Sequence, residues 1–263
     1  MNIIEAIKQR RSVRSFDGKG LSSEALSALR KSAAEASDPF GGKVSILLKS
    51  FDLQEGFRPS TYGFIKGATD FFLLAMGADD ASALSAGFRF EEVVLNARQM
   101  GLGTCWIAGT FKDSDFERGE KWPDGETLKV VCPVGIAAKQ RLLEKVGRYV
   151  MGSKNRKPFA ELFFSENFDT PLSPDSRFGE ALEMMRLAPS STNSQPWRAL
   201  VAGNTVHFYT RKNEFVNLID CGIGMRHFYD TELFHDRKGS FRRLGDTPES
   251  SEGWTYLCSY IAK

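Results

Sequence analysis

The sequence predicts an α+β sandwich, and three observations carry this prediction. Helical and strand-like segments alternate through both halves of the 263 residues, a pattern typical of sheets covered by helices. No low-complexity linker divides the halves, so one interlocked fold is expected rather than two free domains. A hydrophobic content of 41%, with 21 Phe against 6 Tyr, provides apolar side chains for a sizeable core.

Three helices are expected in the first half. Residues 3–7 place isoleucines on one face of a short opening helix that ends near Arg10. Ser22 is a typical N-cap for a second helix. Ala81–Met100 predicts a long third helix, which Gly101 ends. Strands are expected at Val44–Leu48, Phe71–Ala75, Thr104–Ala108 and Leu128–Ile136, with loop at 54–60 and irregular chain at 137–153.

The second half repeats the alternation. Helices are predicted over Arg177–Ala188 and Phe215–Phe234. Between them, Pro189–Pro196 is rich in Ser, Asn and Pro, which predicts an ordered loop. Strands are expected at Ala199–Val201, Val206–Tyr209 and Trp254–Ile261.

Charge and cysteine usage argue against several classes of function. A net charge of +2 is too small to indicate a nucleic-acid or membrane partner, and no apolar run reaches the roughly 20 residues that span a bilayer. The N-terminus lacks the basic-then-apolar layout of a secretion signal, so a cytoplasmic protein is expected. The cysteines show neither a CxxC spacing nor a nearby His, so we expect reduced, buried thiols and no metal site. They are Cys105, Cys132, Cys221 and Cys258.

The segment Arg10-Arg11-Ser12-Val13-Arg14 is a candidate anion site. Three guanidiniums and a hydroxyl just after a short helix can converge on one phosphate. Because a helix C-terminus by itself repels anions, phosphate binding there requires real positive charge. A solvated basic helix end would use the same residues, so this segment alone leaves both interpretations open.

The loop Ala188-Pro-Ser-Ser-Thr-Asn-Ser-Gln-Pro-Trp197 carries a more specific signal. Its two prolines fix the backbone, and its Ser and Asn side chains offer short-range donors and acceptors. Such a loop suits the edge of a flat heteroaromatic ligand. A plain turn between a helix and a strand would need fewer polar side chains.

Two further segments are less specific. Gly101–Gly109 reads Gly-Leu-Gly-Thr-Cys-Trp-Ile-Ala-Gly, and its small residues allow a backbone N–H to approach a ligand. A tight helix-to-strand turn would also explain it. It is not a dinucleotide fingerprint, because no strand precedes it and no helix follows. Asn155-Arg156-Lys157-Pro158 places two cations before a proline.

Together, these four segments resemble the nitroreductase family of FMN flavoproteins, over most of residues 1–165 and 177–230. The resemblance implies FMN phosphate, ribityl and pyrimidine contacts from Arg10, Arg11, Ser12 and Arg14, with Arg14 near N1 and O2. It implies further phosphate contacts from Arg156 and Lys157. Backbone at Trp106, Ile107, Ala108 and Gly109 would lie beside flavin N5, with Ala108 and Gly109 nearest. Packing on the isoalloxazine, normally from a partner subunit, would come from Pro189, Ser190, Ser191 and Asn193.

One departure from the family pattern is informative. In an ordinary member, the Pro-Ser-Ser-x-Asn loop follows the Arg-Arg-Ser segment after one helix. Here Ala33–Gly42 holds that place without the pattern, and the loop follows Arg177–Ala188 instead. The resemblance therefore implies a nitroreductase-like α/β/α sandwich of two diverged half-repeats, 1–165 and 166–263, that form an intramolecular pseudo-dimer. We expect a monomer with one composite flavin site.

The implied function is that of an FMN-dependent oxidoreductase. NAD(P)H would deliver hydride to flavin N5, and a small-molecule electron acceptor such as a nitroaromatic or quinone would then be reduced. Two alternatives stay open: a flavin-fragmenting or dehalogenating relative, and a non-catalytic flavin-binding protein. Phe159, Phe163 and Phe164 are candidates either for the acceptor pocket or for the core.

Overall fold

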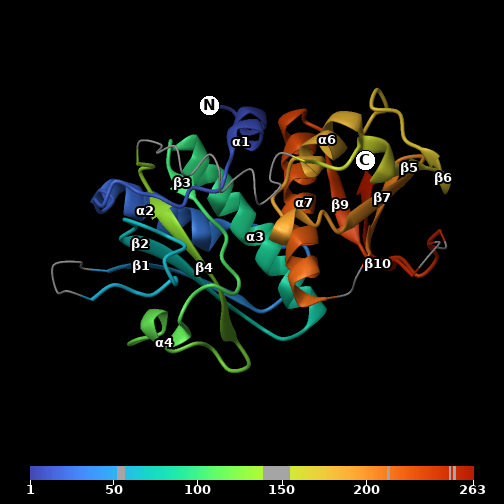
Figure 1. Ribbon diagram of the computed structural model, residues 1–263. Helices are drawn as coiled ribbons and strands as arrows, with labels where there is room; N and C mark the ends of the chain where they lie inside the picture. The colour runs from blue at the N-terminus through green and yellow to red at the C-terminus, as the bar shows by residue number, and fades with distance from the viewer. Residues whose placement is uncertain (52–56, 139–154, 212–213, 249, 251–252) are drawn as a thin grey trace.

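The computed structural model describes residues 1–51, 57–138, 155–211, 214–248, 250 and 253–263. Two sheets lie on opposite sides of a central pair of long helices (Figure 1). The first is four-stranded and the second six-stranded. This arrangement is the mixed helix-and-sheet architecture that the alternation of segments predicts.

The first half of the chain supplies three longer helices and one short one, and Ser22 caps the second helix as expected. The Asn2 side chain accepts a hydrogen bond from the Glu5 N–H, and Ser22 Oγ accepts one from the Ala25 N–H. The helices are α1 (Ile3–Gln9), α2 (Ser23–Glu35), α3 (Asp80–Gln99) and a short α4 (Asp113–Phe116). The strands are β1 (Val44–Ser50), β2 (Asp70–Met76), β3 (Gly103–Thr104) and β4 (Thr127–Gly135).

The second half contains α6 (Gly179–Arg186) and α7 (Phe215–Phe234), with the 3-10 turns η2 (Phe159–Glu161) and η3 (Ser191–Asn193). Its strands are β5 (Phe163–Ser165), β6 (Asn167–Pro171), β7 (Trp197–Ala202), β8 (Thr205–Thr210), β9 (Gly239–Arg242) and β10 (Thr255–Ala262). Among the helices of the described residues, none has both the length and the apolar character to cross a bilayer.

The two sheets share one topology. In the first half, the chain order β1, β2, α3, β3, β4 gives the sheet order β1-β2-β4-β3. In the second half, the chain order β7, β8, α7, β9, β10 gives β7-β8-β10-β9. Every neighbouring pair in both sets is antiparallel. The chain therefore contains two topologically equivalent halves. The boundary between residues 165 and 166 stays a prediction, and β5 and β6 on its two sides pair with each other at the β7 edge.

The halves meet where α3 and α7 cross at a pair of glycines. Gly87 stands seven residues after the start of α3, and Gly222 stands seven residues after the start of α7. A Cβ at Gly222 would lie 2.3 Å from the Leu84 carbonyl oxygen and 3.0 Å from the Gly87 Cα. A Cβ at Gly87 would lie 2.1 Å from the Ile219 carbonyl oxygen. Only glycine lets these two backbones approach so closely.

Charged pairs beside the crossing repeat the same symmetry. Glu91 and Arg226 each follow their glycine by four residues, whereas Glu92 and His227 follow by five. Glu91 Oε1 lies 2.8 Å from His227 Nε2, and Glu92 Oε2 lies 2.5 Å from Arg226 Nη1. On each helix, the residue four positions after the glycine therefore contacts the residue five positions after the glycine of the other helix. Such reciprocity is the signature of a two-fold interface, here inside one chain.

One expected strand is shorter in the structure, two candidate phenylalanines lie in the core, and one expected segment is mostly untested. The strand expected over Thr104–Ala108 is limited to Gly103–Thr104, with one further bridge between Ile107 and Val131. Phe163 and Phe164 are buried, and Phe163 belongs to the main apolar core. Most of the irregular segment expected at 137–153 lies outside the described residues.

The glycine crossing predicts a position-specific loss of stability. Replacing Gly222 by Ala should lower the free energy of unfolding by about 1–3 kcal/mol or more, because the new Cβ meets backbone that cannot swing away. Gly224→Ala is the matched control on the same helix, since its Cβ would meet mainly the Met185 side chain. Urea denaturation should separate the variants, and equal stability of Gly222→Ala and wild type would contradict the close crossing.

Candidate functional site

The amino-terminal motif runs beside the glycine-rich segment. Arg10 is the C-cap of α1, and the chain then extends so that Ser12 forms a parallel bridge with Thr104. The Val13 N–H donates to the Thr104 carbonyl oxygen at 2.8 Å. A Cβ at Gly103 would lie 2.6 Å from a Val13 methyl, so glycine is required for this approach. Two of the four predicted segments therefore lie side by side.

Glu91 of α3 ties these two segments to α7. Its carboxylate is fully buried and accepts a hydrogen bond from Trp106 Nε1 at 2.8 Å. Arg10 Nε lies 3.6 Å from Glu91 Oε1, and His227 Nε2 approaches the same oxygen at 2.8 Å. A buried carboxylate is tolerated only when it is paired, so these contacts fix the side chains around it.

Cys105 lies among the amino-terminal motif's polar groups. Burial raises the pKa of its thiol. The positive charge of Arg14, a hydrogen bond with Ser12 and the positive charge of Arg10 each lower that pKa. The guanidinium of Arg14 also lies 4.8 Å from the centre of the Phe64 ring. Arg10, Ser12 and Arg14 thus all lie close to one another around the start of the glycine-rich segment.

Arg156 connects this region with the loop of the second half. Its guanidinium donates to Asn193 Oδ1, and its Nη2 donates to the Leu187 carbonyl oxygen at 3.0 Å. Burial, together with the positive charges of Arg10 and Arg186, lowers the pKa of Arg156 to about 10. An effect of this kind requires the two positive charges to be near each other, so Arg156, which contacts the Asn193 loop, also lies near Arg10.

The loop itself is held in a rarely populated conformation. Thr192, Asn193 and Gln195 have φ values of 50°, 57° and 48°. Such backbone persists only where surrounding contacts enforce it, and it is common at ligand sites. Lys157 supplies two of these contacts, because its N–H donates to Gln195 Oε1 and its Nζ to the Ser194 carbonyl oxygen, both at 2.8 Å.

Asp220 of α7 holds the other side of the loop. Its carboxylate oxygens accept the Ser191 N–H at 3.1 and 3.0 Å. Burial raises the pKa of Asp220 to about 7, although the hydrogen bonds from Ser191 and Ser194 partly oppose that shift. The loop is therefore anchored by a carboxyl group that changes charge near neutral pH.

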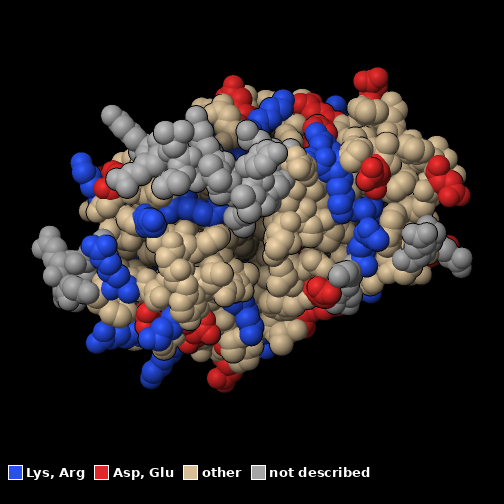
Figure 2. Space-filling model, viewed as in Figure 1, with Lys and Arg blue, Asp and Glu red and all other residues tan. Residues whose placement is uncertain are grey.

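A pocket of 510 Å³ opens on the flank of the loop. Lys157 and Arg211 border it, and burial together with Arg198 and Arg211 lowers the pKa of Lys157. On the face drawn in Figure 2, Lys and Arg side chains lie on both sides of the hollow between the two halves. The pocket is lined by Lys157, Ser191, Thr192, Ser194, Pro196, Arg211, Glu214, Val216 and Asn217.

The structure does not give every predicted residue a contact in this region. Arg11 is exposed, and so are Ala108 and Gly109 just beyond Ile107. Ser190 Oγ accepts the Gln195 N–H at 2.9 Å, so this hydroxyl stabilises the loop internally. Pro189 is half-buried at the start of the loop.

Sequence reasoning missed Glu91, His227 and Asp220. None belongs to a recognisable motif, and each stands within a helix. The available signal was a charged or polar residue on the inner side of an apolar helix, as with Glu91 between Phe90 and Val93. All three are buried and contact the predicted segments or one another.

Comparison with known proteins places the chain in a family. No curated protein matches it. The structure is similar over 99% of the chain to 94% of a "putative nitroreductase" of Thermotoga maritima, with a TM-score of 0.65 and 19% identity. This shows that the two share the nitroreductase fold.

Smaller proteins match about half of the chain. An FMN-dependent nitroreductase of Clostridium difficile covers 52% of it, with 89% of its own length, 19% identity and a TM-score of 0.43. A nitroreductase with bound FMN from Bacteroides fragilis covers 54%, with 91% of its own length, 18% identity and a TM-score of 0.44. The model of the family described as "Putative TM nitroreductase" matches residues 2–231, and the chain belongs to that nitroreductase family.

Proposed function

We propose that the protein is an FMN-dependent oxidoreductase of the nitroreductase type, with one flavin site shared between its two halves. The observation that supports this most is the position of Arg156. It lies close to Arg10 from the first half and donates a hydrogen bond to Asn193 of the second. Proximity between the amino-terminal arginines and the Asn193 loop is what a single composite site requires, so these contacts support the proposal.

The charges at this place suit a phosphate group. The positive charges of Arg10 and Arg186 act on Arg156, and an anion beside Arg156 would offset this repulsion. Arg10 Nε is buried 3.6 Å from Glu91 Oε1, so a phosphate would contact the terminal nitrogens of this guanidinium. A phosphate would accept hydrogen bonds from such guanidiniums in the geometry that arginine favours.

The side chains present would hold FMN in a defined orientation. When bound, FMN would supply the redox chemistry, transferring reducing equivalents from NAD(P)H to a small-molecule acceptor. Arg14 would place positive charge near N1 and O2, and the exposed backbone of Ala108 and Gly109 would face N5. Glu91 fixes Arg10 and Trp106, so it acts as a positioning residue rather than as a contact.

The proposal predicts a yellow protein with about one FMN per chain. NADH or NADPH should bleach the flavin absorbance under anaerobic conditions, and a nitroaromatic or a quinone should restore it. Absorbance and acid-released flavin measure the stoichiometry. Two FMN per chain would contradict the single composite site, and a colourless protein that cannot be reconstituted would contradict the proposal itself.

Removing a phosphate arginine should weaken FMN binding. A charge-assisted hydrogen bond contributes about 1.5–3 kcal/mol, so Arg10→Ala and Arg156→Ala should each raise the FMN dissociation constant about tenfold or more. Arg30→Ala is the matched control, because Arg30 is exposed on α2. Flavin fluorescence quenching measures the binding. If both site variants keep wild-type affinity, the phosphate assignment is wrong.

The Asp220 anchor predicts a pH-dependent stability. Its pKa in the folded state, about 7, lies above the ordinary value of 3.8, so the protonated form favours folding. This contribution is complete below pH 3.8 and is lost as the pH rises through 7. The melting temperature of Asp220→Asn relative to wild type should therefore increase between pH 4 and pH 8. Thermal unfolding tests this, with the exposed Asp169→Asn as control; parallel pH profiles for Asp220→Asn and wild type would refute it.

A further inference from the structure

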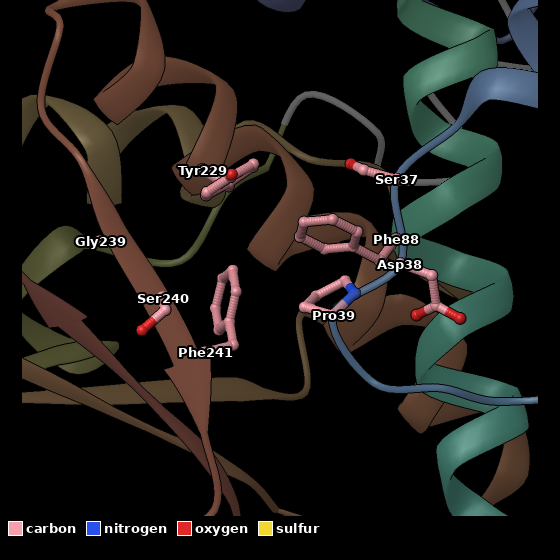
Figure 3. Close-up of a pocket in the computed structure, with 8 residues that line it drawn as sticks. All are labelled: Ser37, Asp38, Pro39, Phe88, Tyr229, Gly239, Ser240 and Phe241. Atoms are coloured by element: carbon pink, nitrogen blue, oxygen red, sulfur yellow. The ribbon is translucent and has the colours of Figure 1, made fainter.

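A second pocket, of 380 Å³, lies between α3, α7, β9 and the segment that follows α2 (Figure 3). Figure 3 shows the rings of Phe88, Tyr229, Phe241 and Pro39 around one space. Its volume falls within the range of small-molecule sites, roughly 300–1,000 Å³. The pocket is lined by Ser37, Asp38, Pro39, Phe88, Tyr229, Gly239, Ser240 and Phe241.

The aromatic side chains of this pocket support one another. Phe88 and Phe241 pack edge to face, with ring centres 5.5 Å apart and planes at 82°. Tyr229 lies 5.7 Å from Phe241, and Phe40 lies 5.5 Å from Phe88. Contacts of this geometry restrain the rings, so the aromatic wall is formed before a ligand arrives.

The position of the pocket follows from the internal symmetry. The proposed flavin site combines the strand after α3 with the loop after α6. The aromatic pocket combines β9, the strand after α7, with Ser37–Pro39, the segment after α2. Because the halves share one topology and their central helices cross at equivalent glycines, the two sites occupy equivalent places.

The chemistry of the two sites differs. The eight lining residues of the aromatic pocket include one acid, Asp38, and no Lys or Arg. The neighbouring Arg226 stacks on Phe88 at 5.1 Å, but its donors contact Ser37, Glu92 and Asp230. A phosphate would find no cation among the lining side chains.

We propose that this pocket binds a neutral, planar aromatic molecule of two or three fused rings. The edge-to-face rings supply the apolar walls, and the absence of lining cations selects against a phosphate-bearing flavin. The site is separate from the proposed FMN site and would be occupied together with it. The protein thus carries two different ligand sites at symmetry-equivalent positions.

Lumichrome, the flavin ring system without ribityl chain or phosphate, is a suitable probe. Equilibrium dialysis against protein saturated with FMN should give about one bound lumichrome per chain. Pro39→Trp places a larger ring in this space, which the Pro39 ring borders in Figure 3, and should weaken lumichrome binding at least tenfold, with unchanged FMN content. Ser114→Phe, on the exposed face of α4, is the matched control and should bind lumichrome like wild type.

A second pocket variant tests the proposal independently, in case the first variant does not fold. Tyr229→Leu keeps apolar volume on α7 but removes an aromatic face, and it should also weaken lumichrome binding. Arg10→Ala lies outside the pocket and should leave lumichrome binding unchanged. This result would separate the aromatic pocket from the flavin site even if the protein binds no FMN. Absence of lumichrome binding to wild type, or wild-type affinity in both folded pocket variants, would overturn the proposal.

Discussion

The close crossing of α3 and α7 is the constraint on which the rest of the molecule depends. Gly87 and Gly222 allow the two backbones to touch, and this contact places Glu91 within reach of His227. A side chain at either glycine would separate the helices and with them the two halves of the proposed flavin site. Backbone contact at the centre therefore determines side-chain positions at the periphery.

Burial of Glu91 turns that contact into a rigid connection. An unpaired carboxylate in the core would cost several kcal/mol. Its partners come from three directions: Arg10 from the end of α1, Trp106 from the chain after β3, and His227 from α7. Each of these three side chains is restrained, because moving it would leave the Glu91 carboxylate with fewer polar partners in an apolar environment. The arginine proposed to bind phosphate is thus positioned by a buried carboxylate of α3.

Sequence reasoning succeeded where a local signal was strong. Phe215–Phe234 was predicted to its observed limits, since a long apolar run lies between polar segments. The short strands β5, β6 and β9 were not predicted, because three to five residues carry little periodicity and depend on partner strands for their conformation. The residues of the four motif segments could be identified from the sequence, because their side-chain types and spacing suit a ligand. Glu91 and Asp220 could not be identified in this way, because their contacts depend on how the helices pack in three dimensions.

Fusion of two halves in one chain explains how the sites could diverge. In a homodimer, one sequence must serve both symmetric sites, so any substitution changes both. Here Ser37–Pro39 and the Asn193 loop hold equivalent places but vary independently. Gly87 and Gly222 remain identical, because the crossing requires glycine from both helices at once. Packing at the shared axis thus constrains the two halves together, whereas ligand chemistry away from the axis constrains each half alone.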